Sequence, residues 1–99
     1  MNMIVGALRL RLRMAENHSL KEKRGIVRSL IARLQNRYQV AAAEVGDNDV
    51  WQTAEVGVAC VSNAASHAEE VLNKVITFVE SERLDVEVVD HEIEILHLT

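Results

Sequence analysis

The sequence has no proline, a single cysteine and only three aromatic residues in 99 positions. One cysteine, Cys60, cannot form an internal disulfide, so it fits a reducing cytosol, and its apolar neighbours predict a buried thiol. The apolar stretch 3–8 is broken at once by arginines, which leaves it too short for a signal peptide or a membrane span. No low-complexity or linker segment divides the chain. We therefore expect a single cytoplasmic domain over residues 1–99.

Residues 19–37 predict one amphipathic helix. Ser19 and Glu22 have the spacing of a capping box, in which the serine side chain accepts a hydrogen bond from the Glu22 amide. Beyond this start, large apolar residues recur at spacings of three and four, which places them on one side of the helix: Leu20, Val27, Leu30, Ile31, Leu34 and Tyr38.

Three stretches alternate with the period of a strand. Residues 4–13 place apolar side chains on one face and three arginines on the other. Residues 39–45 and 54–61 predict a hairpin around a turn at 46–49.

A second helix and a last strand complete the pattern. The spacing of Ser66 and Glu69 predicts another capping box, and helical period continues to about residue 82. From Leu84 the period returns to two, with Val86 and Val88 also inward, but the inward phase slips by one residue before Ile93. We expect a bulge within residues 89–91 to cause this slip.

The order β-α-β-β-α-β predicts an α+β fold of the ferredoxin-like class, in which two helices cover one face of a four-stranded antiparallel sheet. The expected strand order is 4-1-3-2. The expected core combines both helices with the sheet and contains Leu8, Leu10, Val27, Leu30, Leu34, Val58, Leu72 and Val75.

Charge is divided unevenly along the chain. Residues 1–37 hold nine of the eleven lysines and arginines and only two acidic residues, a net charge of +7, whereas residues 38–99 have a net charge of −11. In the predicted fold the first and last strands are neighbours, so we expect exposed ion pairs between their side chains, Arg9, Arg11 and Arg13 on one strand and Glu87, Glu92 and Glu94 on the other.

These strand pairs leave the cations of the first helix unexplained. Cations are mildly unfavourable in the first turns of a helix, where unpaired amides already give a partial positive charge. A phosphate near the helix start would receive amide and side-chain donors together. The candidate RNA- or anion-binding residues are Ser19, Lys21, Lys23, Arg24 and Arg28, and Arg33 and Arg37 are expected to extend them along one edge. Neutralisation by Glu22 and by acidic residues of the second half explains the same cations equally well.

The sequence offers little evidence for metal binding or catalysis. Asp47 and Asp49, with Glu44 nearby, offer oxygen ligands for a hard cation, but Trp51 occupies a ligand position of the calcium-loop pattern, and a solvated turn is the better interpretation. The histidines at 91 and 97 are about 20 Å apart along a strand at ~3.3 Å per residue, too far to share a metal. No nucleophile and base have motif spacing. We therefore expect no enzyme activity, no metal and no cofactor.

Two functions common to this topology are disfavoured. An acylphosphatase-like enzyme needs a glycine-rich phosphate loop after the first strand, and residues 14–18 contain no glycine. An RNA-recognition motif needs aromatic residues on its central strands for base stacking, and residues 4–13 and 54–61 contain none.

Three segments together resemble the YlxP-like family of small bacterial proteins, a domain of unknown function: IVGALRLRLRM, HSLKEKRGIVRSLIARLQNRYQV and AEVGDNDVWQTAEVGVACVSN. The resemblance implies a ferredoxin-like fold. Because members are often encoded near translation and ribosome-maturation factors, it also suggests work around RNA or the ribosome, by association alone. It supplies no catalytic residue.

Two functional hypotheses follow. The first is a non-enzymatic accessory protein that binds structured RNA or a ribosomal particle through the first helix. The second is a homo-oligomeric module that binds a protein or a small ligand, in which the helix cations pair with acidic residues of another subunit. Small residues at Ala41, Ala43, Gly57 and Ala59 predict a flat uncovered sheet face, which favours self-association.

Overall fold

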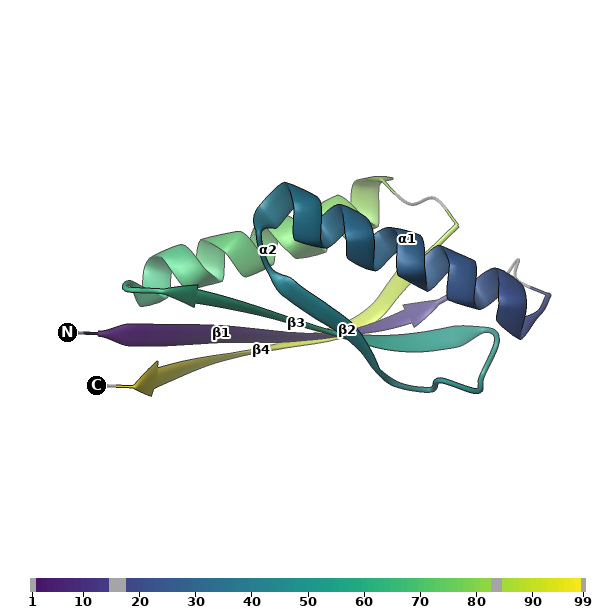
Figure 1. The fold of residues 1–99 in the computed structure, drawn as a ribbon, viewed down its shortest axis with the longest axis horizontal. Helices are drawn as coiled ribbons and strands as arrows, with labels where there is room; N and C mark the ends of the chain where they lie inside the picture. Colours follow the sequence, from purple (N-terminus) through teal and green to yellow (C-terminus); the bar gives the residue numbers. More distant parts are fainter. Residues whose placement is uncertain (1, 15–17, 83–84, 99) are drawn as a thin grey trace.

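The computed structural model describes residues 2–14, 18–82 and 85–98. Its elements follow the predicted β-α-β-β-α-β order: β1 Met3–Arg13, α1 Leu20–Tyr38, β2 Ala41–Gly46, β3 Thr53–Ser62, α2 Ala65–Glu82 and β4 Glu87–Leu98. The strands form one antiparallel sheet in the order β2-β3-β1-β4, as predicted. Figure 1 shows both helices on the same face of the sheet, which leaves the opposite face uncovered.

The core lies between the helices and the sheet. It contains every residue predicted for it, and Leu10, Leu30, Leu34, Leu72 and Val75 are completely buried. Gly6 lets α2 approach β1 closely, because a Cβ at this position would lie 3.0 Å from Leu72 Cδ1 and 3.2 Å from Ala68 Cβ. The inward row of β1 therefore sets the distance between helix and sheet.

The predicted irregularity in the last strand is present. The register between β1 and β4 shifts between Arg11 and Leu12, which pair with Asp90 and Val88, so Val89 is the additional residue of a bulge. This bulge accounts for the slip in the hydrophobic phase. The expected inward position of Leu84 lies outside the described residues.

The predicted capping box of the second helix is wrong. The helix begins at Ala65, and the Ala68 amide donates to the Ala64 carbonyl, so Ser66 lies inside the first turn. Ser62 contributes instead, because its Oγ accepts a hydrogen bond from the Ala64 amide at 3.1 Å and fixes the chain just before the helix.

The central position of Leu30 gives a test of the packing. Leu30→Ala removes a completely buried side chain from α1 and should lower the free energy of unfolding by about 2–5 kcal/mol. Asn36→Ala, at an exposed position of the same helix, should change it by less than about 0.5 kcal/mol. Urea denaturation measures both, and equal midpoints for the two variants would contradict the placement of α1 on the sheet.

Candidate nucleic-acid interface

The start of α1 has the predicted cap. Ser19 is the N-cap residue in extended conformation, and its Oγ accepts a hydrogen bond from the Glu22 amide at 3.1 Å. The serine side chain thus satisfies one of the amides that an anion would otherwise use. Ser19 contributes to this surface by fixing the helix start.

Lys23 is buried, unlike its neighbours in the basic segment. Its side chain is 0% exposed, its Nζ lies 2.9 Å from Glu44 Oε2, and it donates a hydrogen bond to the Asp47 carbonyl. Both partners belong to the β2–β3 region, so this ammonium group joins the start of α1 to the end of β2. A completely buried and paired lysine is not available to an external phosphate, and Lys23 therefore does not belong to the exposed basic surface.

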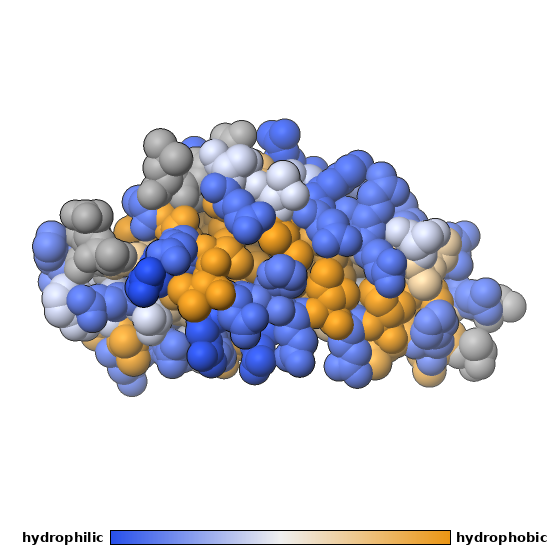
Figure 2. Space-filling model, turned by 180° about the vertical axis from the view of Figure 1, so that it is seen from behind, coloured by the Kyte–Doolittle hydropathy of each residue, from blue (hydrophilic) through white to orange (hydrophobic). Residues whose placement is uncertain are grey.

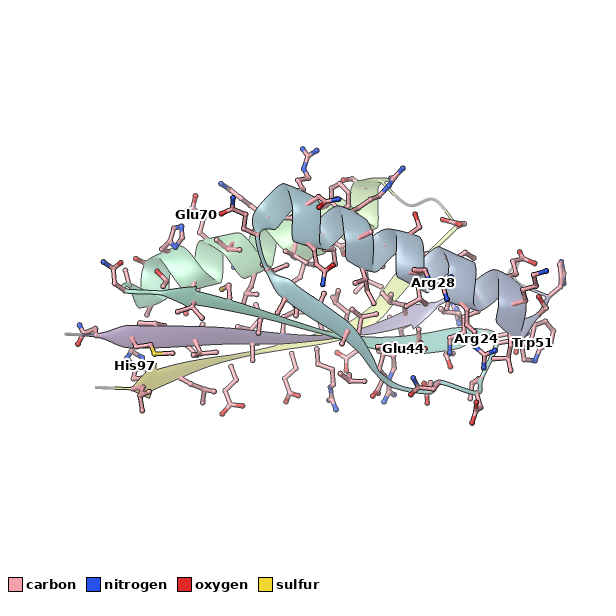
Figure 3. The ribbon with its side chains drawn as sticks, in the orientation of Figure 1. Arg24, Arg28, Glu44, Trp51, Glu70 and His97 are labelled. Carbon is pink, nitrogen blue, oxygen red and sulfur yellow. The ribbon has the colours of Figure 1, made fainter. Side chains whose placement is uncertain are left out.

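Three other candidates lie together on the surface. Lys21, Arg24 and Arg28 are exposed, and at 100° per residue they fall within a 60° sector of the helix. Figure 3 shows Arg24 and Arg28 on the side of α1 where β2 forms the edge of the sheet, with Trp51 at the same end of the molecule as Arg24. We call Lys21, Arg24 and Arg28 the basic row.

Arg33 and Arg37 lie on the other flank of α1 and do not lengthen the basic row. The Arg37 guanidinium is 5.2 Å from the centroid of the Phe78 ring on α2, and its Nε donates to the Tyr38 hydroxyl at 3.2 Å. Arg33 lines a groove beside the same phenylalanine. The expectation that these two arginines extend the first cluster along one edge is therefore wrong in its geometry.

The strand arginines form ion pairs on the uncovered face of the sheet, largely as predicted. Arg9 pairs with Glu92 at 3.1 Å, and Arg13 pairs with Glu87 at 2.6 Å. Arg11 instead pairs at 2.8 Å with Glu55 on β3, and the hydrogen bond and charge of this carboxylate raise the pKa of Arg11 above its usual value. The difference arises because β1 has a neighbouring strand on each side.

These contacts account for much of the charge asymmetry. Each described lysine or arginine outside α1 has a carboxylate oxygen within 3.1 Å, as does Lys23. Among residues 2–14, 18–82 and 85–98, the cations that lack such a carboxylate are all exposed residues of α1, and three of them form the basic row.

The turn after β2 has the features of a locally stabilised loop. Asp47 adopts a left-handed conformation with φ 58°, its carbonyl accepts from the Val50 amide at 3.0 Å, and its Oδ2 accepts from Thr53 Oγ1 at 3.1 Å. Glu44 is engaged by Lys23. Within the described part of the chain, no three His, Cys, Asp or Glu side chains are grouped so as to hold a metal ion. Neither described helix is long and apolar enough to span a membrane.

The fold resembles solved structures of two designed proteins. The designed protein LFR1 1, with a ferredoxin fold, has a TM-score of 0.56 at 13% identity, over 96% of this chain and 85% of that one. The designed protein Foldit4 has a TM-score of 0.53 at 14% identity, over 98% and 97% of the two chains. At such identities these similarities show the fold alone.

The family follows from the sequence comparisons. The chain belongs to the family described as "Protein of unknown function (DUF503)", whose model matches residues 5–93. It is 38% identical over 63 residues to the uncharacterized protein YlxP of Bacillus subtilis (strain 168). The matched segment covers 64% of this chain and 68% of that protein. The resemblance to the YlxP-like family is therefore confirmed.

The Lys23–Glu44 pair gives a test of what holds the basic row in place. Glu44→Ala leaves the buried Lys23 ammonium without its carboxylate and should cost about 3 kcal/mol, since removing one partner of a buried pair is strongly destabilising. In Lys23→Met/Glu44→Ala, which removes both charges, most of that stability should return. Chemical denaturation measures both effects.

Glu69→Ala is the matched control, because it removes an exposed glutamate with no ion pair to another described residue. It should change stability by less than about 0.5 kcal/mol. If Glu44→Ala costs no more than Glu69→Ala, the buried pair does not stabilise the junction between α1 and β2.

Proposed function

We propose that this chain is a non-enzymatic cytosolic accessory protein that binds structured RNA or a ribosomal particle through the basic row of α1. The observation that carries this proposal is the charge balance of the surface. The strand arginines and Lys74 are paired with carboxylates, whereas Lys21, Arg24 and Arg28 are exposed without one among the described residues.

The position of the basic row fits a polyanion better than a single small anion. Lys21 and Arg28 are seven positions apart on the helix, a distance of about 10 Å at ~1.5 Å per residue. A duplex strand presents one phosphate per ~3.4 Å of axis in the B form, so a row of this length faces about three phosphates. The positive end of the α1 dipole lies at the same end as the row and adds to its attraction for phosphate.

This mode of binding needs no aromatic platform on the sheet. The outward side chains of the central strands are aliphatic, small or charged, so recognition through the helix relies on backbone phosphates and shape, as is usual for double-stranded RNA. Trp51, 39% exposed in the β2–β3 connection, lies near the same end of the molecule and supplies a spectroscopic signal there. As the single tryptophan, it reports binding without a label.

A salt titration with ribosomal RNA tests the proposal. Affinity should fall steeply with salt, because binding at the basic row releases counterions. Reversing the row in Lys21→Glu/Arg24→Glu/Arg28→Glu should weaken binding by more than about tenfold and reduce the salt slope by about 3, roughly one unit for each lost phosphate contact. Trp51 fluorescence measures the binding.

Single reversals supply the matched comparison. Arg24→Glu and Lys74→Glu change the net charge equally, but Lys74 lies on α2 and is paired with Glu70 at 3.1 Å. Only Arg24→Glu should weaken binding strongly. If the folded triple variant binds ribosomal RNA as the wild type does, the basic row is not the RNA surface, and the homo-oligomeric protein- or ligand-binding module becomes the better hypothesis.

A further inference from the structure

The uncovered face of the sheet is apolar at one end and charged at the other. At the end with both chain termini, four large apolar side chains of the face are at least 40% exposed, including Val61 at 67% and Leu98 at 63%; the others are Met3 and Leu96. Monomeric proteins rarely expose contiguous apolar patches larger than a few hundred Å². Figure 2 shows hydrophobic residues reaching the surface on the sheet side and continuing toward this end.

The middle of this face is shallow because its side chains are small. Ala41, Ala43 and Ala59 point outward there, and the side chain of Val45 lies across Gly57, where a Cβ would come within 3.0 Å of Val45 Cγ1. A depression of about 340 Å³ results. The depression lies mainly over β2 and β3, beside the half of the face that β1 and β4 form.

The charged end consists of two adjacent rows of opposite sign. The row on β1 contains Arg9, Arg11 and Arg13, and the row on β4 contains Asp90, Glu92 and Glu94. Glu94 lies opposite Ala7 and has no cation partner among the described residues. Arg9 uses one terminal nitrogen toward Glu92, and its guanidinium keeps further donors for a second carboxylate.

This arrangement is complementary to itself. Two copies can stack with their uncovered faces together, related by a two-fold axis that runs parallel to the strands and passes between β1 and β4. This rotation places β1 of each copy over β4 of the other. The arginine row of each copy then lies over the acidic row of the other copy. The same rotation places the apolar end with Val5 over the end of β4 with Leu96 and Leu98 in the other copy. Aligned stacking of two sheets about 10 Å apart is a standard packing mode.

We infer that a second copy of this chain covers the half of the face formed by β1 and β4, in a closed two-fold dimer with the uncovered sheets stacked. In this arrangement β1 and β4 of one copy lie over β4 and β1 of the other, so about a dozen outward side chains of each copy form the contact, fewer than the 20–30 residues a side in standard interfaces, and we expect a weak dimer. The dimer leaves the basic row exposed, because α1 covers the opposite face of the sheet. Dimerisation and RNA binding can therefore be tested separately.

Sedimentation equilibrium over about 1 µM to 1 mM protein measures the dimer directly. The wild-type chain should sediment as a dimer in the upper part of this range. Leu96→Glu introduces a carboxylate at the apolar end and should raise the dimer dissociation constant by at least about 100-fold. Val50→Glu is the matched control, because Val50 is 44% exposed in the β2–β3 connection and lies off the face; it should leave the constant unchanged.

A second variant tests the charge rows. Glu94→Lys removes no ion pair from the described monomer but places a cation against the arginine row of the other copy, so it should weaken the dimer about tenfold while the circular dichroism spectrum stays unchanged. This result stands even if Leu96→Glu fails to fold. A wild-type monomer at every concentration, open-ended oligomers, or a dimer unaffected by Glu94→Lys and by a folded Leu96→Glu would each overturn the inference and leave the face to a different partner.

Discussion

The alternation along β1 is the constraint on which the rest of the structure depends. This strand pairs with β3 on one side and β4 on the other, so its even-numbered side chains enter the core and its odd-numbered side chains line the uncovered face. A slip of one residue would exchange Leu8, Leu10 and Leu12 with the arginines and bury three charges. The register of this one strand thus fixes the core, the ion pairs and the apolar end of the face together.

Elements that depend on local period could be predicted from the sequence, and those that depend on a partner elsewhere could not. The bulge at Val89 is visible in the sequence because the inward phase changes between Val88 and Ile93. The true start of α2 is not visible in the sequence, because it depends on Ser62 at the end of β3 rather than on the capping pattern at Ser66. In the same way, Glu55 as the partner of Arg11 depends on a hairpin strand 44 residues away.

Lys23 shows the same limit within the candidate site. Its spacing to Val27, Leu30 and Leu34 places it on the buried side of α1, which is the one signal of burial in the sequence. A lysine is rarely completely buried without a partner, and that partner, Glu44, comes from β2. Within a run of surface cations, the helical spacing alone is therefore insufficient to separate a structural lysine from a binding one. The burial of Lys23 reduces the four candidate cations to the three residues of the basic row.

The two proposed surfaces lie on opposite sides of the sheet, and this has a consequence for RNA binding. In a dimer stacked through the uncovered faces, the helices form the two outer layers and the two basic rows point away from each other. One short RNA duplex cannot contact both basic rows, but a folded RNA that surrounds the dimer can. Once such an RNA has bound one row, its binding to the second row is intramolecular. Two weak sites joined in this way bind far more tightly than either alone, provided that the RNA spans both. Three cations per copy are few for a tight complex, so under the proposed function we expect a large structured RNA or ribosomal particle to bind better than a short duplex.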